Sequence, residues 1–359
     1  MNSDRYLSVL YVGYPLLTVS EDSAGGAEQM LVTLERGMAG AGHRTTVAAS
    51  EGSRVTGRLL ATGHRASGPD QYEHREQEHT AGILAYLRRH PHDFGLIHDM
   101  SGRFWRHAAN CGVPALATLH LPRSFCRDES FRDMPPNLYF NCVSNAQARS
   151  FSDLPNFLGV VPNGILIDRF PLTTEKRASV LWLGRICEEK GPHLAIQAAK
   201  KAGVPLVLAG QVYPFSYHQR YFEQKIRPHI ADEAGAAVQF VDTPTLAHKI
   251  DLLRHARAVI LCSTVEETSS LVALEAMACG TPVVAFRRGA FPEVVADGIT
   301  GHMVDTVEQM AEALERVSSI SPHACRAWVK ERFTADRMRR DYEALYHAIV
   351  SNSANQSAA

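Results

Sequence analysis

The sequence predicts two α/β domains, each built on a parallel β-sheet that helices cover on both faces. Short β-rich runs alternate with longer helical stretches along most of the chain, which is typical of open parallel sheets. The segment Ser8–Gly13 (SVLYVG) is closely repeated at Ser179–Gly184 (SVLWLG), where the whole pattern begins again. A length of 359 residues also suits two domains, since domains usually span about 100–200 residues each.

The first domain is expected to begin with a strand at residues 7–12, a loop that contains glycine, and a helix over residues 27–41. The helix is predicted because Met30, Leu34 and Met38 recur at i, i+4 and i+8 and therefore share one face. The other strands are expected at residues 45–49, 96–98, 115–119, 140–143 and 159–161.

The second domain is predicted to follow a polar stretch at residues 171–178 and to repeat the same order. Its strands are expected at 179–183, 206–209, 238–241, 258–261 and 283–285, and its helices at 192–201, within 216–230, at 245–255 and at 271–279. We therefore expect two Rossmann-like domains, 1–171 and 172–335, then a helix at 336–350 and a disordered polar tail at 351–359. Such sheets bind ligands beyond the carboxyl ends of their strands.

The net charge and the cysteine content limit which binding partners and which cellular compartment we expect. The net charge is −1 and the isoelectric point about 7.0, so no broad positive field is available to hold nucleic acid or an anionic membrane. The apolar stretch at residues 7–19 is shorter than a membrane span of about 20 residues, and we interpret it as a buried strand and its loop, not a signal peptide. Seven cysteines without a CxxC pair suit reduced thiols and a cytoplasmic location.

A local anion site is suggested by the loop that follows the first strand of the second domain. Its sequence, Gly184–Pro192 (GRICEEKGP), delivers Arg185 and Lys190 to the start of a helix. Arginine offers a planar fork of donors, and a helix N-terminus adds unpaired N–H groups, so the combination suits a diphosphate. The alternative is a solvated loop in which the two cations pair with Glu188 and Glu189. The spacing is not that of a Walker phosphate loop.

A second candidate lies at residues 266–280, where a strand leads through acidic residues into a helix. Ser269 and Ser270 are good residues for the start of that helix. Glu275 lies among apolar neighbours, where a carboxylate is costly unless it is paired or bound to a ligand. The alternative is that Glu267 and Glu275 are ordinary first-turn and surface acids.

Taken together and in order, these motifs resemble the family-4 group of retaining GT-B glycosyltransferases. That family carries a Gly-Arg-x-x-x-x-Lys-Gly loop, two glutamates separated by seven residues, and a Glu-Ala-Met-Ala-x-Gly-x-Pro-Val-Val motif. The matching positions here are Gly184, Arg185, Lys190 and Gly191, then Glu267 and Glu275, and then Glu275–Val284. Shorter matches in the first domain are Gly25-Gly26-Ala27-Glu28, Thr118-Leu119-His120 and Pro162-Asn163-Gly164. The resemblance covers nearly the whole chain.

The resemblance implies a GT-B fold, in which two Rossmann-like domains face each other across a cleft and a last helix can cross back to the first domain. It implies an enzyme that moves a sugar from a nucleotide diphosphate donor, most often a UDP-sugar, to an acceptor hydroxyl with retention. No metal or other cofactor is expected. The implied acceptor is a glycan, a lipid-linked molecule or a small molecule in polysaccharide or glycoconjugate biosynthesis, with no nucleic acid and at most peripheral membrane contact.

The resemblance also assigns roles to single residues. The implied catalytic set is Glu267, His120, Arg185 and Lys190: the two cations neutralise the leaving diphosphate, Glu267 binds hydroxyls of the donor sugar, and His120 touches that sugar near the reacting centre. Glu275 is expected to accept hydrogen bonds from the ribose. The rest of the implied donor site comprises Gly25, Gly26, Ser270, Leu271 and Val272 for the phosphates, the backbone near Gly210 and Val241 for the base, and Asn163.

The chain departs from the family between the two glutamates. Where the family has Glu-x-Phe-Gly-Leu-Val, this sequence has Glu267-Thr268-Ser269-Ser270-Leu271-Val272. The backbone at Ser270 must therefore avoid the angles that only glycine adopts, and the serine hydroxyls are free to add contacts to phosphate or sugar.

Other functions share the predicted architecture. A nucleotide-sugar epimerase of the same fold is one alternative. A non-catalytic two-domain sugar-binding protein is another, but it has no use for two cations beside a carboxylate pair. A dehydrogenase is disfavoured, because neither Gly13 nor Gly184 opens a GxGxxG motif.

Two segments that contain histidine are further candidates. His74 and His79 are five residues apart on a predicted helix with no cysteine beside them, so a solvated helix face is favoured over a metal site. His98 and Asp99 end a strand, where either contact with an acceptor or a packing role is open.

Overall fold

The computed structural model describes residues 6–23, 25–66, 68–126, 131–230 and 238–358, and the chain divides into two compact units. The first unit comprises residues 1–164 and 335–359, and the second comprises residues 165–334. The division falls a few residues before the expected boundary at 171/172. The reason is that Ile165 and Phe170 pack in the core of the second unit and the Ile165 N–H donates to the carbonyl of Phe333 at 2.9 Å.

The first unit is built on a parallel sheet of seven strands in the order β3-β2-β1-β4-β5-β6-β7. The strands are β1 (Ser8–Val12), β2 (Arg44–Ala49), β3 (Arg58–Ala61), β4 (Leu96–Asp99), β5 (Ala115–Leu119), β6 (Leu138–Cys142) and β7 (Phe157–Val160). The sequence analysis missed β3, a four-residue edge strand without β-branched residues. The order of the strands reverses at β1, so that β2 and β4 flank it, which is the topology of doubly wound sheets.

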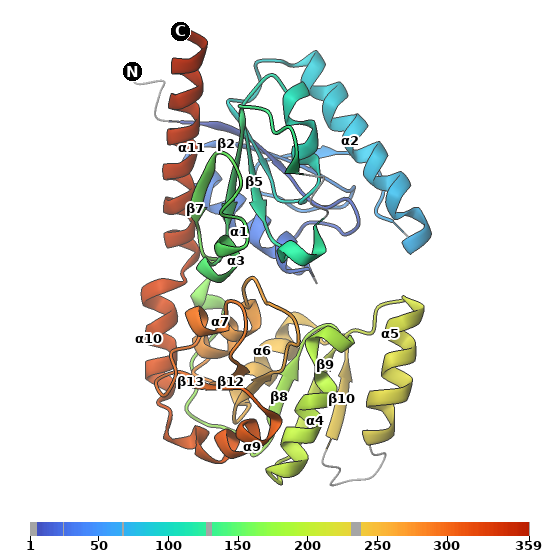
Figure 1. Cartoon of the computed structure of the whole chain (residues 1–359), viewed down its shortest axis with the longest axis vertical. Helices are drawn as coiled ribbons and strands as arrows, with labels where there is room; N and C mark the ends of the chain where they lie inside the picture. The colour runs from blue at the N-terminus through green and yellow to red at the C-terminus, as the bar shows by residue number, and fades with distance from the viewer. Residues whose placement is uncertain (1–5, 24, 67, 127–130, 231–237, 359) are drawn as a thin grey trace. The chain divides into compact units, whose positions relative to one another are not determined.

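Four α-helices complete the described part of the first unit: α1 (Gly26–Gly40), α2 (Tyr72–Arg89), α3 (Asn145–Arg149) and α11 (Ala335–Ala358). Helix α11 packs along α1 (Figure 1). It continues through residues 351–358, where the sequence analysis wrongly expected a disordered tail. Extending an existing helix fixes one residue for each new hydrogen bond, so even a polar segment of alanine, serine, asparagine and glutamine can prolong it.

The second unit is built on a parallel sheet of six strands in the order β10-β9-β8-β11-β12-β13. They are β8 (Val180–Leu183), β9 (Leu206–Gly210), β10 (Val238–Asp242), β11 (Val259–Leu261), β12 (Val283–Phe286) and β13 (Gly301–Val304). The sequence analysis missed β13, a short edge strand that begins with glycine. Only glycine fits there, because a Cβ on Gly301 would lie 1.8 Å from the Val283 carbonyl oxygen.

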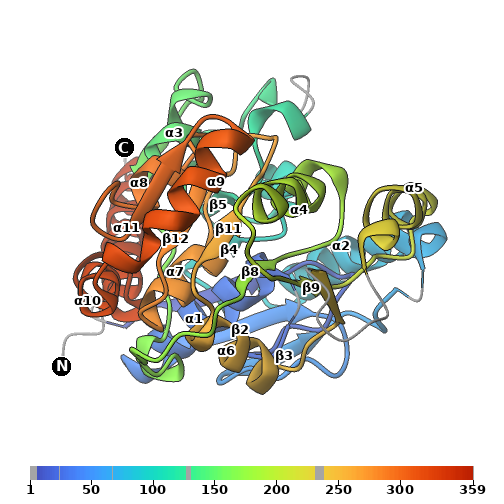
Figure 2. The same cartoon turned by 90° about the horizontal axis from the view of Figure 1, so that it is seen from below.

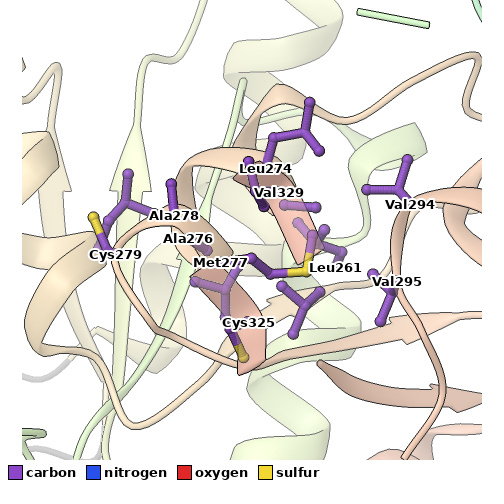
Figure 3. Packing of buried hydrophobic residues seen from close by; sticks show 14 of the residues in the cluster. Leu261, Leu274, Ala276, Met277, Ala278, Cys279, Val294, Val295, Cys325 and Val329 are labelled. Carbon is purple, nitrogen blue, oxygen red and sulfur yellow. The ribbon is translucent and has the colours of Figure 1, made fainter. Parts of the chain in front are cut away.

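Helices cover both faces of the second sheet, as the sequence predicts. They are α4 (Pro192–Lys201), α5 (Ser216–Tyr221), α6 (Leu246–His255), α7 (Leu271–Ala278), α8 (Phe291–Val294), α9 (Val307–Arg316) and α10 (Pro322–Arg332). Val180 and Trp182 of β8 face one core, and Leu181 and Leu183 face the other, because successive strand residues point to opposite faces. Figure 2 shows α4 and α9 side by side over the first of these cores. Figure 3 shows residues of α7 packed with Leu261 and Val329 in the second.

The seven cysteines, which all lie in described segments, form no disulfide bonds, and six of them are buried. Within the described ranges, none of the helices combines the length and the apolar character that a membrane span requires.

Candidate functional site

The loop between β8 and α4 carries both predicted cations of the second unit. The Arg185 guanidinium donates to the Glu189 carboxylate at 3.0 Å and lies over the Tyr213 ring, 5.6 Å from its centroid. Lys190 donates to Glu267 at 2.6 Å. Arg185 pairs within its own loop, as the solvated-loop alternative describes, whereas Lys190 pairs with Glu267, another predicted site residue 77 positions along the chain.

Backbone geometry fixes this loop against the strand ends. Gly191 has φ +67°, and a Cβ there would lie 2.2 Å from the Cys262 carbonyl oxygen. The Glu189 carbonyl accepts hydrogen bonds from the Thr264 N–H at 2.9 Å and from the Ser263 hydroxyl at 3.1 Å. Both cations are thus held at the carboxyl edge of the sheet, directly before the N-terminus of α4.

Gly210 and Val241 lie at the ends of the neighbouring strands β9 and β10. Gly210 has φ +150°, and a Cβ there would lie 1.7 Å from the Gly184 carbonyl oxygen. The Ile186 N–H donates to the Gln211 carbonyl at 3.0 Å. The two positions expected to read a base therefore border the loop that carries the cations.

Helix α7 begins as the sequence predicts. The Ser270 hydroxyl accepts a hydrogen bond from the Ala273 N–H at 3.2 Å, and Ser270 has φ −144°, an ordinary extended conformation. The replacement of glycine by Ser270 therefore causes no strain. The first-turn N–H groups, which include those of Leu271 and Val272, are the ones that a helix leaves without an intrahelical acceptor, and the positive end of the helix dipole favours an anion there.

Glu275 is the most deeply buried acid of the site, with 3% of its surface exposed. One oxygen, Oε1, accepts from Lys249 Nζ at 2.6 Å. The other, Oε2, is buried without a hydrogen-bond partner among the described residues. Glu275 is therefore not the ordinary surface acid of the alternative interpretation: it is a compensated buried carboxylate with one acceptor oxygen unused.

Lys249 is a site residue that the sequence analysis missed. It lies on α6, on the same face as the buried Leu252 and Leu253 at i+3 and i+4. A lysine on the apolar face of a helix was the available signal, because a buried cation needs a carboxylate partner.

The remaining predicted residues lie in the first unit. Gly25 precedes α1 and Gly26 begins it, and a Cβ on Gly25 would lie 1.9 Å from an oxygen of the buried Glu28. His120 follows β5, and burial lowers its pKa to about 4. Asn163 is buried, and its carbonyl accepts from Arg337 at 3.3 Å. The structure therefore distributes the predicted set over the two units.

His98 and Asp99 have a packing role, which resolves the open interpretation of that strand end. His98 is fully buried, with Nδ1 2.6 Å from the Tyr346 hydroxyl and Nε2 2.7 Å from the Thr118 hydroxyl. The Asp99 carboxylate accepts from the N–H and the hydroxyl of Ser101 at 2.8 and 2.6 Å. Neither side chain is exposed to an acceptor.

The expectation of a uniformly solvated helix face at His74 and His79 is wrong for His79. His74 is exposed, but His79 is buried and its Nδ1 lies 2.6 Å from the Thr62 hydroxyl. The buried residues of α2 are Arg75, His79, Ile83 and Leu87. Their regular spacing of four residues was a signal that this face packs against the unit.

Comparisons with known proteins bear on the fold of the chain and on the sequence of the second unit. The model of the family described as "Glycosyl transferases group 1" matches residues 166–332. Among solved structures, sucrose-phosphate synthase from Thermosynechococcus elongatus superposes with a TM-score of 0.78 at 19% identity, covering 96% of this chain and 100% of that one. Anabaena HepE in complex with UDP and glucose gives a TM-score of 0.74 at 17% identity, covering 95% and 99% of the two chains.

A curated relative is similar over a shorter stretch. The D-inositol 3-phosphate glycosyltransferase of Mycobacterium tuberculosis (strain H37Rv) is 35% identical over 142 residues, which are 38% of this chain and 29% of that protein. Aligned sequence thus spans less than a third of the relative.

These findings define the class of protein: a chain with the two-sheet α/β fold of GT-B glycosyltransferases. The family model matches almost the whole of the second unit, and the chain is similar in fold to GT-B glycosyltransferases.

Proposed function

We propose that this chain is a retaining glycosyltransferase that moves a sugar from a nucleotide diphosphate donor, in the first instance a UDP-sugar, to an acceptor hydroxyl without a metal. The observation that carries the proposal is the grouping of Arg185, Lys190, Glu267 and Glu275 in one unit, with Glu275 Oε2 buried and unused. The family of the second unit supports it. The structure of HepE with UDP and glucose supports the choice of nucleotide.

In the proposed reaction, Arg185 and Lys190 bind the diphosphate. Its negative charge grows as the bond to the sugar breaks, so preorganised cations there stabilise the transition state more than the ground state. Lys190 already touches Glu267 at 2.6 Å. A donor whose phosphates contact Lys190 would therefore bring its sugar hydroxyls within reach of Glu267.

Glu275 is proposed to bind the ribose. A carboxylate oxygen without a partner is an acceptor for a hydroxyl, and burial strengthens that hydrogen bond. Lys249 compensates the charge of Glu275 from the other side at 2.6 Å. The N-terminus of α7 and the strand ends at Gly210 and Val241 would complete the phosphate and base contacts of the second unit.

The first unit is proposed to supply His120, the Gly25-Gly26 loop and Asn163, and to bind the acceptor. Burial lowers the pKa of His120 to about 4, so its imidazole is neutral near pH 7 and can both donate and accept hydrogen bonds to sugar hydroxyls. The acceptor is proposed to be a glycan, a lipid-linked molecule or a small molecule.

A thermal-shift panel of UDP, GDP and ADP and of their sugars tests the proposal. A ligand that binds only the folded protein raises its stability by RT ln(1 + [L]/Kd), or about 2.7 kcal/mol at a hundredfold excess over Kd. We expect stabilisation by uridine nucleotides, with release of free UDP from UDP-sugar in the presence of acceptor and of EDTA. Stabilisation by no nucleotide would favour the non-catalytic sugar-binding protein instead, and conversion of the sugar without release of UDP would favour an epimerase.

A further inference from the structure

Cys187, Glu189 and His218 form a cluster beside the anion loop that the proposed transfer does not use. One ligand atom from each, Sγ, a carboxylate oxygen and a ring nitrogen, lies within 4.8 Å of both others. Cys187 and Glu189 come from the loop between β8 and α4, and His218 comes from α5. Two segments of the second unit that lie about thirty residues apart in sequence therefore converge on one point.

His218 is the observation that points to a ligand. Its side chain is buried, with 1% of the residue exposed, and among the described residues neither Nδ1 nor Nε2 has a hydrogen-bond partner. The rings of Tyr217 and Phe215 pack against it, with centroids 4.2 and 5.4 Å away. A buried polar group without a hydrogen-bond partner is costly. His218 has two such groups, its ring nitrogens, in a ring that aromatic neighbours hold in place.

The other two members of the cluster also have unused capacity. The Cys187 thiol is fully buried; it lies 3.4 Å from the Arg185 carbonyl oxygen, to which it donates, and it also hydrogen-bonds the Glu189 side chain. The Glu189 carboxylate is half-buried and accepts from Arg185 at 3.0 Å through Oε1. Each of these groups could therefore give one ligand atom to an ion without breaking the fold around it.

We propose that Cys187, Glu189 and His218 bind a divalent transition-metal ion of the Zn²⁺ class. One thiolate, one imidazole and one carboxylate are the ligand types that zinc uses in proteins, whereas magnesium and calcium require oxygen ligands throughout. On binding, the metal–sulfur bond replaces the S–H bond and the thiol proton passes to solvent, while His218 binds as the neutral imidazole. Three protein ligands leave a fourth position for water.

The site has a consequence for Arg185. A metal ion on the Glu189 carboxylate competes with the Arg185 guanidinium for the same group, so occupancy releases Arg185 toward an anion. If Arg185 binds the donor diphosphate, which rests on the proposed function, metal and nucleotide stabilise each other's binding, and the coupling is reciprocal. The metal takes no part in the transfer itself.

Cobalt titration of the full chain tests the site directly. After treatment with EDTA and dialysis, we expect one Co²⁺ per chain with a thiolate-to-metal absorption band in the near ultraviolet, and displacement by Zn²⁺. Cys187→Ser should abolish that band, and His218→Asn should weaken Co²⁺ binding at least about tenfold, since a direct ligand matters no less than the outer-shell groups whose loss costs 10–100-fold. Circular dichroism and thermal unfolding establish that each variant is folded.

Matched controls separate this site from adventitious binding by the other histidines and thiols. His229→Gln removes an exposed histidine that contacts Lys200, and Cys126→Ser removes a thiol of the first unit. Both should keep the band and the affinity. Absence of a stoichiometric ion, a band that persists in Cys187→Ser, or equal loss in the control variants would overturn the proposal.

Nucleotide binding is measured separately, by titration of UDP with and without one equivalent of Zn²⁺. We expect tighter UDP binding with the metal and no such gain in His218→Asn. A chain that binds Co²⁺ through Cys187 but binds no nucleotide would overturn the proposed function and leave the metal site standing.

Discussion

Each unit contains its own parallel sheet, and individual buried polar side chains of the two units differ in how fully they are hydrogen-bonded. In the first unit, His98 uses both ring nitrogens, one with Tyr346 and one with Thr118. In the second, Glu275 leaves one oxygen and His218 both ring nitrogens without partners in the part of the chain that the structure describes. A buried network in which every polar atom is hydrogen-bonded stabilises a fold. Buried polar atoms without partners are costly until a ligand supplies the missing interactions. The comparison therefore indicates a packing role for His98 and a capacity to bind ligands for Glu275 and His218.

Acid is expected to destabilise the first unit more than the second, the largest effect that follows from the comparison. Burial lowers the pKa of His79, His98 and His120, all in the first unit, to about 4, 3 and 4, below the value of about 6.5 in an unfolded chain. Below that pH the unfolded state binds more protons, so stability falls as pH falls, by up to about 1.4 kcal/mol per pH unit for each histidine. Burial also lowers the pKa of four histidines of the second unit, but by less: His193, His218, His229 and His302. As the pH is lowered, hydrogen exchange with mass spectrometry should show that the first unit loses its protection before the second unit does.

Two variants on α2 test whether buried histidines cause this sensitivity to acid. His79→Gln should reduce the pH dependence of unfolding by up to one proton, and His74→Gln, which removes an exposed histidine of the same helix, is the control. A first unit as resistant to acid as the second would contradict buried, neutral histidines.

Removing Lys190 is expected to have the largest effect on turnover. Lys190→Ala deletes a cation from the proposed diphosphate site and leaves the Glu267 carboxylate, 14% exposed, without its 2.6 Å partner. We expect turnover to fall roughly 10²-fold, about 2.7 kcal/mol in the barrier, as for other groups that stabilise transition-state charge. Release of UDP from UDP-sugar measures it. The control Lys201→Ala removes an exposed lysine of the same unit that pairs with Glu308, and it should keep full activity. Equal activity in both variants would show that Lys190 is not part of the diphosphate site.

Much of the fold could be predicted from the sequence, because the strands buried on both faces are continuous apolar runs. The runs at β1 and β8 are examples, since each is followed by a glycine and then a helix. The edge strands β3 and β13 could not be predicted in this way, since an edge strand needs no such run. The continuation of α11 past residue 350 also went unpredicted, because its composition alone is typical of disorder.

The candidate site residues could be named from the sequence, but their pairings could not. Arg185, Lys190, Glu267 and Glu275 were expected because their motifs resemble those of a known family, since spacing alone favoured a solvated loop and surface acids. The pairing of Lys190 with Glu267 and of Lys249 with Glu275 depends on how α6, α7 and the β8–α4 loop meet, which no local pattern states. The unpartnered ring nitrogens of His218 could not be predicted from the sequence either, because they depend on how the side chain packs.

Breaking the hydrogen-bond network around His98 should lower the stability of the first unit and leave nucleotide affinity unchanged. The Tyr346 hydroxyl lies 2.6 Å from His98 Nδ1 and donates to the Tyr11 hydroxyl at 3.4 Å. Tyr346→Phe removes this hydroxyl and leaves His98 Nδ1 without its partner, and we expect a loss of about 1–3 kcal/mol in the free energy of unfolding. Denaturant titration measures the loss, and UDP affinity should stay unchanged. Tyr6→Phe, which removes an exposed hydroxyl of the same unit, is the control. A loss of UDP affinity in Tyr346→Phe would show that the two kinds of network are not separate in function.

The smallest expected effect comes from the half-used carboxylate of the second unit. Lys249→Met keeps the length of the side chain but leaves Glu275 buried without a counter-charge, since Lys249 Nζ is its 2.6 Å partner. The carboxylate then loses both its counter-charge and the hydrogen bond that holds it in position, so we expect UDP to bind about tenfold more weakly, or about 1.4 kcal/mol. Glu275→Gln should produce a similar loss, and the double variant should lose little more than either single one, because both changes act on the same acceptor. Calorimetric titration of UDP measures all three, with the exposed Lys225→Met as the matched control. Fully additive losses would mean that Lys249 contacts the nucleotide itself, and the role of Glu275 Oε2 as the ribose acceptor would then have to be tested apart from its lysine.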